Sequence, residues 1–217
     1  MMKRVILAAV GILAFAGSAQ ATSFGFDCIS SSPVACAVGE AQLAVDVTDS
    51  GSGTLTLVFS NSDPGTSVVR GIYVDDASNL VKKISSVGGA GTNFKKGGKP
   101  ADLPGGSVVG FSADFRSVAR KPKADNGIAG GESLTVVLTL EGGVTFADVL
   151  AAIANGDMRF GVNITRADPG CIGSTTPACI ADPGEGSLVS LSAVPEPFAA
   201  VLGGVACIGL ALIGRRR

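Results

Sequence analysis

The cysteines of the central part of the chain fall into two segments of the same spacing, and the chemistry they suggest is disulfide formation. Each segment places seven residues between its cysteines and contains a Ser, a Pro and a closing A-C. The spacing favours two local bonds, Cys28–Cys36 and Cys171–Cys179, although a crossed arrangement that joins the two ends of the domain is also open. A zinc site is the weaker alternative, because structural zinc prefers closely spaced ligands and the chain has no His. Paired cysteines indicate an oxidising compartment.

Residues suited to catalysis are scarce. The absence of His excludes His-based acid–base chemistry and the nucleophile sets that depend on it. Two facing carboxylates could serve a glycosidase, and Asp75-Asp76 is the most visible pair, but neighbouring strand residues point to opposite faces. We interpret the pair as a strand-end turn. No D-x-D-x-D-G loop is present for calcium, and the sequon at Asn163 lies inside a predicted strand. We expect no enzyme, no catalytic residue, no metal ion and no cofactor.

Basic residues concentrate in one stretch. Between Gly91 and Lys123 there are seven bases and two acids, whereas residues 22–194 together carry 12 bases and 17 acids. The negative total and the few aromatic residues among the bases argue against a nucleic-acid partner. Two interpretations stay open: solubilising loops, or loops that contact an anionic polysaccharide or lipid headgroups. The bases are Lys95, Lys96, Lys99, Arg116, Arg120, Lys121 and Lys123.

Short strands separated by turns must hold these residues. Alternating apolar and polar residues predict strands at 41–48, 54–60, 68–74, 80–87, 107–115, 133–140 and 158–165. The polar runs 94–100 and 116–123 are predicted as loops. Residues 145–155 form the one predicted helix, with Thr145 to cap its start and Gly156 to end it. The predicted fold class is mainly β: an antiparallel β-sandwich with one short helix.

The two ends of the chain are apolar. Lys3 and Arg4 precede a short apolar run, and Ala19 and Ala21 form an A-x-A-like site, so residues 1–21 are predicted as a signal peptide cut after Ala21. A permanent anchor is the alternative, but the run is too short to span a bilayer. At the other end, residues 198–214 are 17 residues without a charge. As a helix they would be about 25 Å long, slightly shorter than the hydrocarbon core of a bilayer, which is about 30 Å thick.

Val194-Pro195-Glu196-Pro197 precedes this apolar run, and Arg215 to Arg217 follow it. The C-terminal segment resembles the PEP-CTERM sorting signal, which some classifications label an ice-binding protein C-terminal domain. The resemblance implies recognition by exosortase, a membrane-embedded transpeptidase-like enzyme of Gram-negative bacteria that make exopolysaccharide. It also implies export by the general secretion machinery and a precursor held transiently in the inner membrane. An ordinary permanent anchor is the alternative. The residues that carry the resemblance are Val194, Pro195, Glu196, Pro197, Arg215, Arg216 and Arg217.

These patterns predict three parts: a signal peptide (1–21), a β-sandwich domain (22–194) and a sorting signal (195–217) with a transmembrane helix over 198–214 and an Arg tail over 215–217. The domain offers no rows of Thr-x-Thr for an ice surface. We expect an exported protein of the cell surface or extracellular matrix, with a structural or adhesive role in an exopolysaccharide matrix. A carbohydrate-binding module for anionic polysaccharide is the alternative, and a carboxylate-based glycosidase is a remote one.

Overall fold

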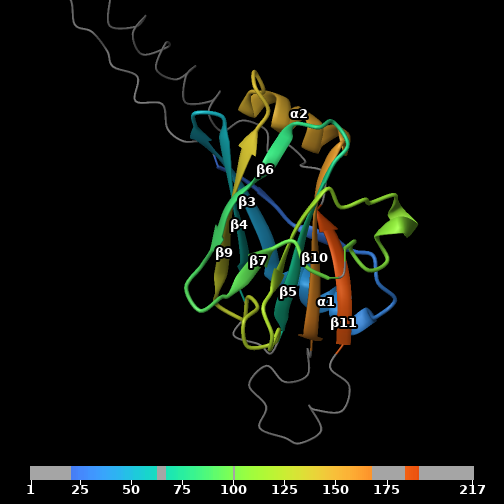
Figure 1. Ribbon diagram of the computed structural model, residues 1–217. Coiled ribbons are helices and arrows are strands. Elements are labelled where there is room, and N and C mark those ends of the chain that lie inside the picture. The colour runs from blue at the N-terminus through green and yellow to red at the C-terminus, as the bar shows by residue number, and fades with distance from the viewer. Residues whose placement is uncertain (1–20, 63–66, 100, 168–183, 191–217) are drawn as a thin grey trace, which may run out of the picture.

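The domain is a sandwich of two antiparallel sheets (Figure 1). The structure is a computed structural model, and it describes residues 21–62, 67–99, 101–167 and 184–190. The predicted fold class is confirmed. The five-stranded sheet has the order β1 (Ala21–Phe24), β3 (Leu43–Gly51), β4 (Thr54–Asn61), β9 (Ser133–Leu140) and β6 (Val81–Gly88). The six-stranded sheet has the order β2 (Phe26–Cys28), β11 (Gly184–Ser190), β10 (Met158–Ala167), β5 (Val68–Asp76), β8 (Phe115–Ala119) and β7 (Phe94–Lys96).

The core lies between the sheets and follows from alternation along the strands. In β4, Leu55, Leu57 and Phe59 are buried while the residues between them are half-buried. Phe59 meets Phe160 of the opposite sheet edge-on, with ring centroids 6.3 Å apart. Such an aromatic pair adds about 0.5–1.5 kcal/mol to the stabilisation from burial. Because β10 turns Phe160 and its alternate neighbours inward, the residues between them face away from the core.

The helix α2 (Phe146–Asn155) confirms the predicted helix. Thr145 caps it by accepting from the backbone N–H of Asp148, and the Asp148 carboxylate accepts from the backbone N–H of Thr145. Gly156 ends the helix in the left-handed conformation, with φ at 79°. Val149 and Ile153 are buried against the sandwich, so the helix covers one end of the core (Figure 1).

A second helix, α1 (Pro33–Gln42), was absent from the sequence patterns, so the prediction of a single helix is incomplete. Pro33 and Gly39 look like turn residues, yet Pro suits the first turn of a helix. Ser32 caps the start by accepting from the backbone N–H of Ala35 at 3.3 Å. Gly39 lets the helix approach β11, because a Cβ there would lie 2.5 Å from Leu188 Cδ2. The strand predicted from residue 41 therefore begins at Leu43.

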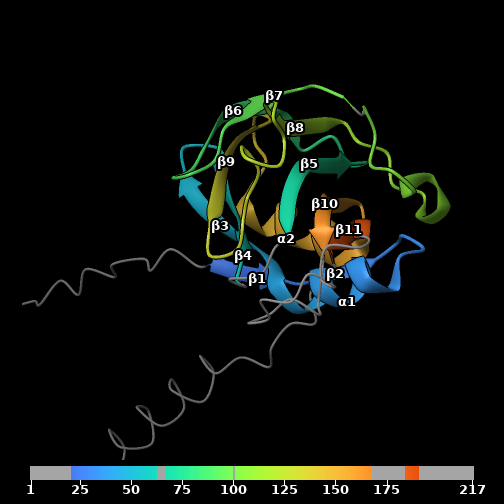
Figure 2. The same ribbon diagram turned by 90° about the horizontal axis from the view of Figure 1, so that it is seen from below.

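Two further predictions are wrong. The strand predicted at 107–115 is a 3-10 turn, η1 (Gly106–Val109), followed by a loop. Its apolar residues suggested a buried strand, but Val108 is 83% exposed. The runs 94–100 and 116–123, predicted as loops, contain β7 and most of β8. Both strands are short; β7 is the edge strand, where polar residues are tolerated, and β8 lies next to it. Figure 2 shows β7 beside β6, the last strand of the other sheet.

Candidate functional site

The predicted basic residues lie at one edge of the six-stranded sheet. β7 is the last strand there and pairs antiparallel with β8, with Lys95 opposite Val118 and Lys96 opposite Ser117. This pairing brings together the two basic runs that are separate in the sequence. We call the seven bases the basic edge: Lys95, Lys96, Lys99, Arg116, Arg120, Lys121 and Lys123.

Three side chains of the basic edge are used to hold backbone carbonyls. The Arg116 guanidinium donates to the carbonyl of Gly98 at 2.7 Å. The Lys123 ammonium donates to the carbonyl of Lys99 at 2.8 Å. Lys96 is held in a similar way by the neighbouring sheet. These contacts fix the shape of the edge.

The other four side chains of the basic edge are exposed and have no ion-pair or hydrogen-bond partner among the described residues. Within the described part of the chain the two ion pairs are Arg70–Glu185 and Arg159–Asp75, and neither involves this edge. No described residue forms a side-chain hydrogen bond with the four either. Their charges are therefore available to a ligand: Lys95, Lys99, Arg120 and Lys121.

Two lysines of β6 extend this charged region, and the sequence did not reveal them as part of it. The Lys96 ammonium crosses to the other sheet and donates to the carbonyls of Ile84 at 3.2 Å and Ser85 at 3.0 Å. This contact places β7 beside the strand that carries the exposed Lys82 and Lys83. The two lysines lie within a predicted strand, and nothing in their spacing indicates where that strand would lie.

The carboxylates of Asp75 and Asp76 both have structural partners. Asp76 is the last residue of β5, and its carboxylate accepts from the backbone N–H of Leu80 at 3.0 Å and of Val81 at 2.7 Å. This confirms the predicted strand-end turn. Asp75 is 5% exposed and forms an ion pair with Arg159. The two carboxylates thus serve different contacts.

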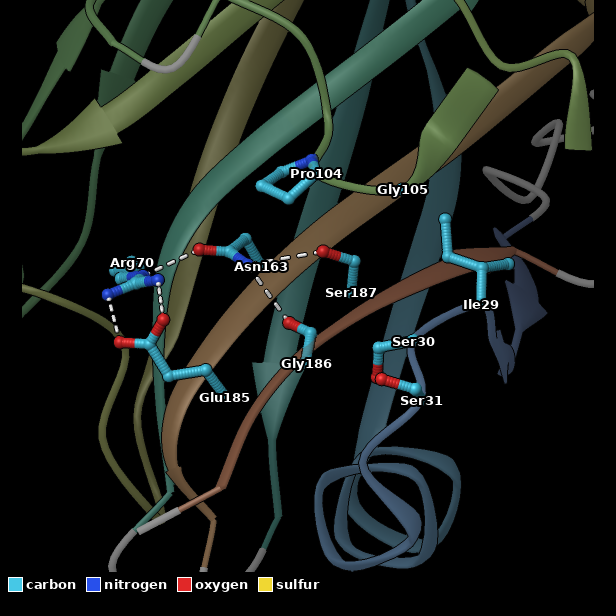
Figure 3. Close-up of a pocket in the computed structure, with 10 residues that line it drawn as sticks. All are labelled: Ile29, Ser30, Ser31, Arg70, Pro104, Gly105, Asn163, Glu185, Gly186 and Ser187. Atoms are coloured by element: carbon cyan, nitrogen blue, oxygen red, sulfur yellow. Dashed lines mark hydrogen bonds and ion pairs between the residues drawn. The ribbon is translucent and has the colours of Figure 1, made fainter. Parts of the chain in front are cut away.

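A pocket of about 410 Å³ lies on the outer face of the six-stranded sheet (Figure 3). The sequence did not predict it, because its residues come from β5, β10, β11 and two loops. The only signals were two polar residues, Arg70 and Asn163, each with apolar residues or glycine next to it in its strand. It is lined by Ile29, Ser30, Ser31, Arg70, Pro104, Gly105, Asn163, Glu185, Gly186 and Ser187.

A hydrogen-bonded network forms the polar side of the pocket (Figure 3). Asn163 is 3% exposed, and its Oδ1 accepts from Arg70 Nε at 2.6 Å. Its Nδ2 donates to the carbonyl of Gly186 at 3.0 Å and to the hydroxyl of Ser187 at 3.2 Å. The Arg70 guanidinium also donates to both carboxylate oxygens of Glu185, each at 2.7 Å. The sequon at Asn163, discounted from the sequence, is thus a buried structural amide.

The disulfide Cys28–Cys36 closes the loop that forms one wall of the pocket. The predicted bond is present, with the two Cα atoms 5.0 Å apart. It encloses Ile29 and the two serines that follow, and the backbone N–H of Ile29 donates to the carbonyl of Ser187 at 3.0 Å. Because these sulfurs are bonded to each other, a zinc site at this pair is excluded. The predicted bond Cys171–Cys179 lies outside the described residues.

The loop over residues 101–114 forms the opposite wall. Leu103 and Phe111 pack over Tyr73 in a small apolar cluster on the outer face of the sheet. The Arg159 guanidinium donates to the carbonyl of Val109 at 2.9 Å and lies 5.4 Å from the centre of the Phe111 ring. These contacts fasten the loop, so its two pocket residues are held in place.

Tyr73 lies beneath this loop and is fully buried. Its hydroxyl has no hydrogen-bond partner among the described residues. Burial raises the pKa of Tyr73 to about 12. The pKa is lowered to a lesser degree by the positive charges of Arg70, on the same strand, and Arg116, opposite Tyr73 on β8. The hydroxyl is therefore neutral at ordinary pH.

Several predicted features lie outside the described residues. They are the signal segment before residue 21, the sorting residues Val194 to Pro197, the apolar run and the Arg tail. In the part that is described, neither helix has the length and apolar character needed to cross a membrane.

No protein-family model, no curated protein and no solved structure matches this chain. The arrangement of the described side chains therefore carries the functional argument.

Proposed function

We propose that this chain is an exported matrix protein whose domain adheres to anionic polysaccharide through the basic edge. In this proposal the tail is the sorting signal that exosortase recognises, and the mature protein resides at the cell surface or in the extracellular matrix. The resemblance of the tail and the predicted signal peptide support the destination. The disulfide Cys28–Cys36 fits an oxidising compartment.

One observation carries the binding proposal: four exposed bases on one edge have no partner among the described residues. A single exposed ion pair contributes only about 0.2–1 kcal/mol. A polyanion meets several such charges at once, so the contributions combine and become strongly dependent on salt. Polysaccharide is favoured over nucleic acid because the edge presents few aromatic side chains for stacking on bases.

Chromatography on immobilised alginate tests the binding. We expect the exported protein to be retained at low salt and eluted at roughly 0.3 M NaCl, where screening is strong. Replacing three exposed bases, K95A, R120A and K121A, should abolish retention. The variant A147E, A151E and A154E lowers the net charge by the same amount on the exposed side of α2 and should still be retained.

Loss of retention in both variants would mean that total charge, and not the edge, controls binding. Unchanged retention of the edge variant would refute the proposal. Retention on vesicles with anionic lipids but not on alginate would assign the edge to a membrane surface instead.

Substitutions in the C-terminal sorting signal test whether exosortase sorts the protein to the cell surface or matrix. Replacing Glu196 or Pro197 with Ala should leave the precursor uncut and bound to the membrane. The intact mass of the mature wild-type protein should lack the residues after about position 197, with both predicted disulfides formed. Normal maturation of the variants would contradict sorting by exosortase.

A further inference from the structure

We propose that the pocket on the outer face of β5, β10 and β11 binds one uncharged, polyhydroxylated sugar unit of the polysaccharide. This inference deepens the proposed function and rests on it for the source of the ligand. In this inference the pocket selects the sugar, and the basic edge attracts the acidic groups of the polysaccharide.

The pocket is held open before any ligand arrives. Its polar side is fixed by Asn163, which bonds to three neighbours. One wall is closed by the disulfide Cys28–Cys36, and the other is fastened by Arg159. A volume of about 410 Å³ lies within the range of small-molecule sites, towards its lower end. A ligand therefore binds without first ordering the chain, which favours affinity.

The groups that face the pocket both donate and accept hydrogen bonds. Three N–H groups of Arg70 are used by Asn163 and Glu185, and no other described residue takes the remaining ones. Ser187 accepts from Asn163, so its own O–H stays available to donate. Ser30 and Ser31 add hydroxyls on the wall that the disulfide closes, as Figure 3 shows. Sugar hydroxyls also both donate and accept, so they match this set.

The charges of the pocket exclude other classes of ligand. Arg70 and Glu185 form a bidentate ion pair, so the pocket has no net charge. A phosphate or sulfate beside Arg70 would be repelled by the Glu185 carboxylate, and a cation beside Glu185 would be repelled by the guanidinium. A wholly apolar ligand would remove these groups from water without replacing their hydrogen bonds, which is costly. An uncharged ligand rich in hydroxyl groups avoids all three penalties, and Ile29 and Pro104 offer apolar surface to its C–H groups.

One polysaccharide chain can reach both regions. Arg70 lies in β5, and β5 is followed in the sheet by β8 and then β7. With strands about 4.8 Å apart, the pocket and the basic edge are separated by roughly 10 Å across the same sheet. A neutral unit can therefore occupy the pocket while an acidic unit of the same chain lies over the lysines.

NMR titration of the ¹⁵N-labelled exported protein tests this inference. The probes are glucose, galactose, mannose, N-acetylglucosamine and cellobiose at pH 7. We expect at least one of them to shift the amide signals of the pocket residues, with a Kd on the order of 1 mM that is unchanged in 0.5 M NaCl. The variant E185A should weaken this binding at least tenfold, whereas E141A, an exposed carboxylate on a turn after β9, should bind as the wild type does.

The outcomes separate the two proposals. The edge variant K95A, R120A and K121A should keep sugar binding and lose alginate retention. The variant E185A should lose sugar binding and keep alginate retention. If no sugar shifts the pocket signals, or if the shifts lie at the basic edge, the inference is overturned while alginate retention still decides the proposed function. Equal weakening by E141A would show that E185A acts through net charge, which also overturns the inference.

Discussion

The pocket and the basic edge lie on the same sheet but are built in opposite ways. The basic edge comes from two nearby runs of sequence, and most of its charges have no partner among the described residues. The pocket comes from five separate segments, and Asn163 bonds at once to β5 and β11. The edge can therefore lose any one of its four bases without a partner and keep its shape, whereas the pocket depends on each contact that holds its walls in place. The following predictions test this difference, from the largest expected effect to the smallest.

Replacing Arg159 with Met should have the largest effect. It leaves the Asp75 carboxylate buried without its cation and releases the loop over residues 101–114. We expect a loss of about 3 kcal/mol in the free energy of unfolding and a loss of sugar binding, with alginate retention intact in the folded protein. Urea denaturation and both binding assays measure this. The variant R120M, on an exposed base, should be as stable as the wild type.

Removing the disulfide with C28S and C36S should come next. Cross-linking a nine-residue ring stabilises the fold by about 2–3 kcal/mol through restriction of the unfolded chain. Because this ring forms a wall of the pocket, sugar binding should also weaken. Denaturation and the sugar titration give the result, and full sugar affinity in the double variant would show that the wall needs no cross-link.

Replacing Tyr73 with Phe should stabilise the domain by about 1 kcal/mol, because a buried hydroxyl without a partner is removed. The pH dependence should change as well. Between pH 10 and about 12 the unfolded chain releases the Tyr73 proton while the folded chain keeps it, so the wild type loses stability as the pH rises.

This part of the alkaline loss should vanish in Y73F, since the chain has a single Tyr. Denaturation at pH 8 and pH 11 measures the difference between the two proteins. Parallel stability curves would mean that the pKa of Tyr73 is the same in the folded and unfolded chains, so that its hydroxyl is not desolvated by burial.

Two neighbouring lysines should give the smallest effects and separate the two roles within the basic edge. K96M should lower the free energy of unfolding by about 1 kcal/mol, because Lys96 holds two carbonyls of the other sheet. K95M should leave stability unchanged and lower the salt concentration that elutes the protein from alginate. Denaturation and elution of both variants give the comparison, and the same result for both would refute the division of roles.

Local signals predicted much of the fold. Thr145 and Gly156 mark the ends of α2, and strict alternation marks β4 and β9. α1 was missed because Pro33 and Gly39 resemble turn residues, and only the contact with β11 explains the glycine. Residues 107–115 were predicted as a strand because their apolar residues were taken as buried, whereas η1 exposes Val108 and Val109.

Of the two candidate sites, one could be predicted from the sequence and the other could not. The bases of the edge could be found from composition, since they are close in sequence. The pocket could not, because Arg70 and Asn163 are far apart in the chain and meet only through the register of β5 and β10, where Asn163 lies opposite Gly71. A polar residue among apolar neighbours within a strand was the one available sign.

The lysines on the outermost strands also affect how copies of the protein behave when they accumulate. β6 and β7 each end a sheet, and an unpaired strand edge can recruit a strand from another molecule. Addition of a strand there would strip water from ammonium groups of Lys82, Lys83 and Lys95, and two copies meeting edge to edge would oppose like charges. The lysines of β6 and β7 therefore oppose the addition of a strand from another copy at these two edges.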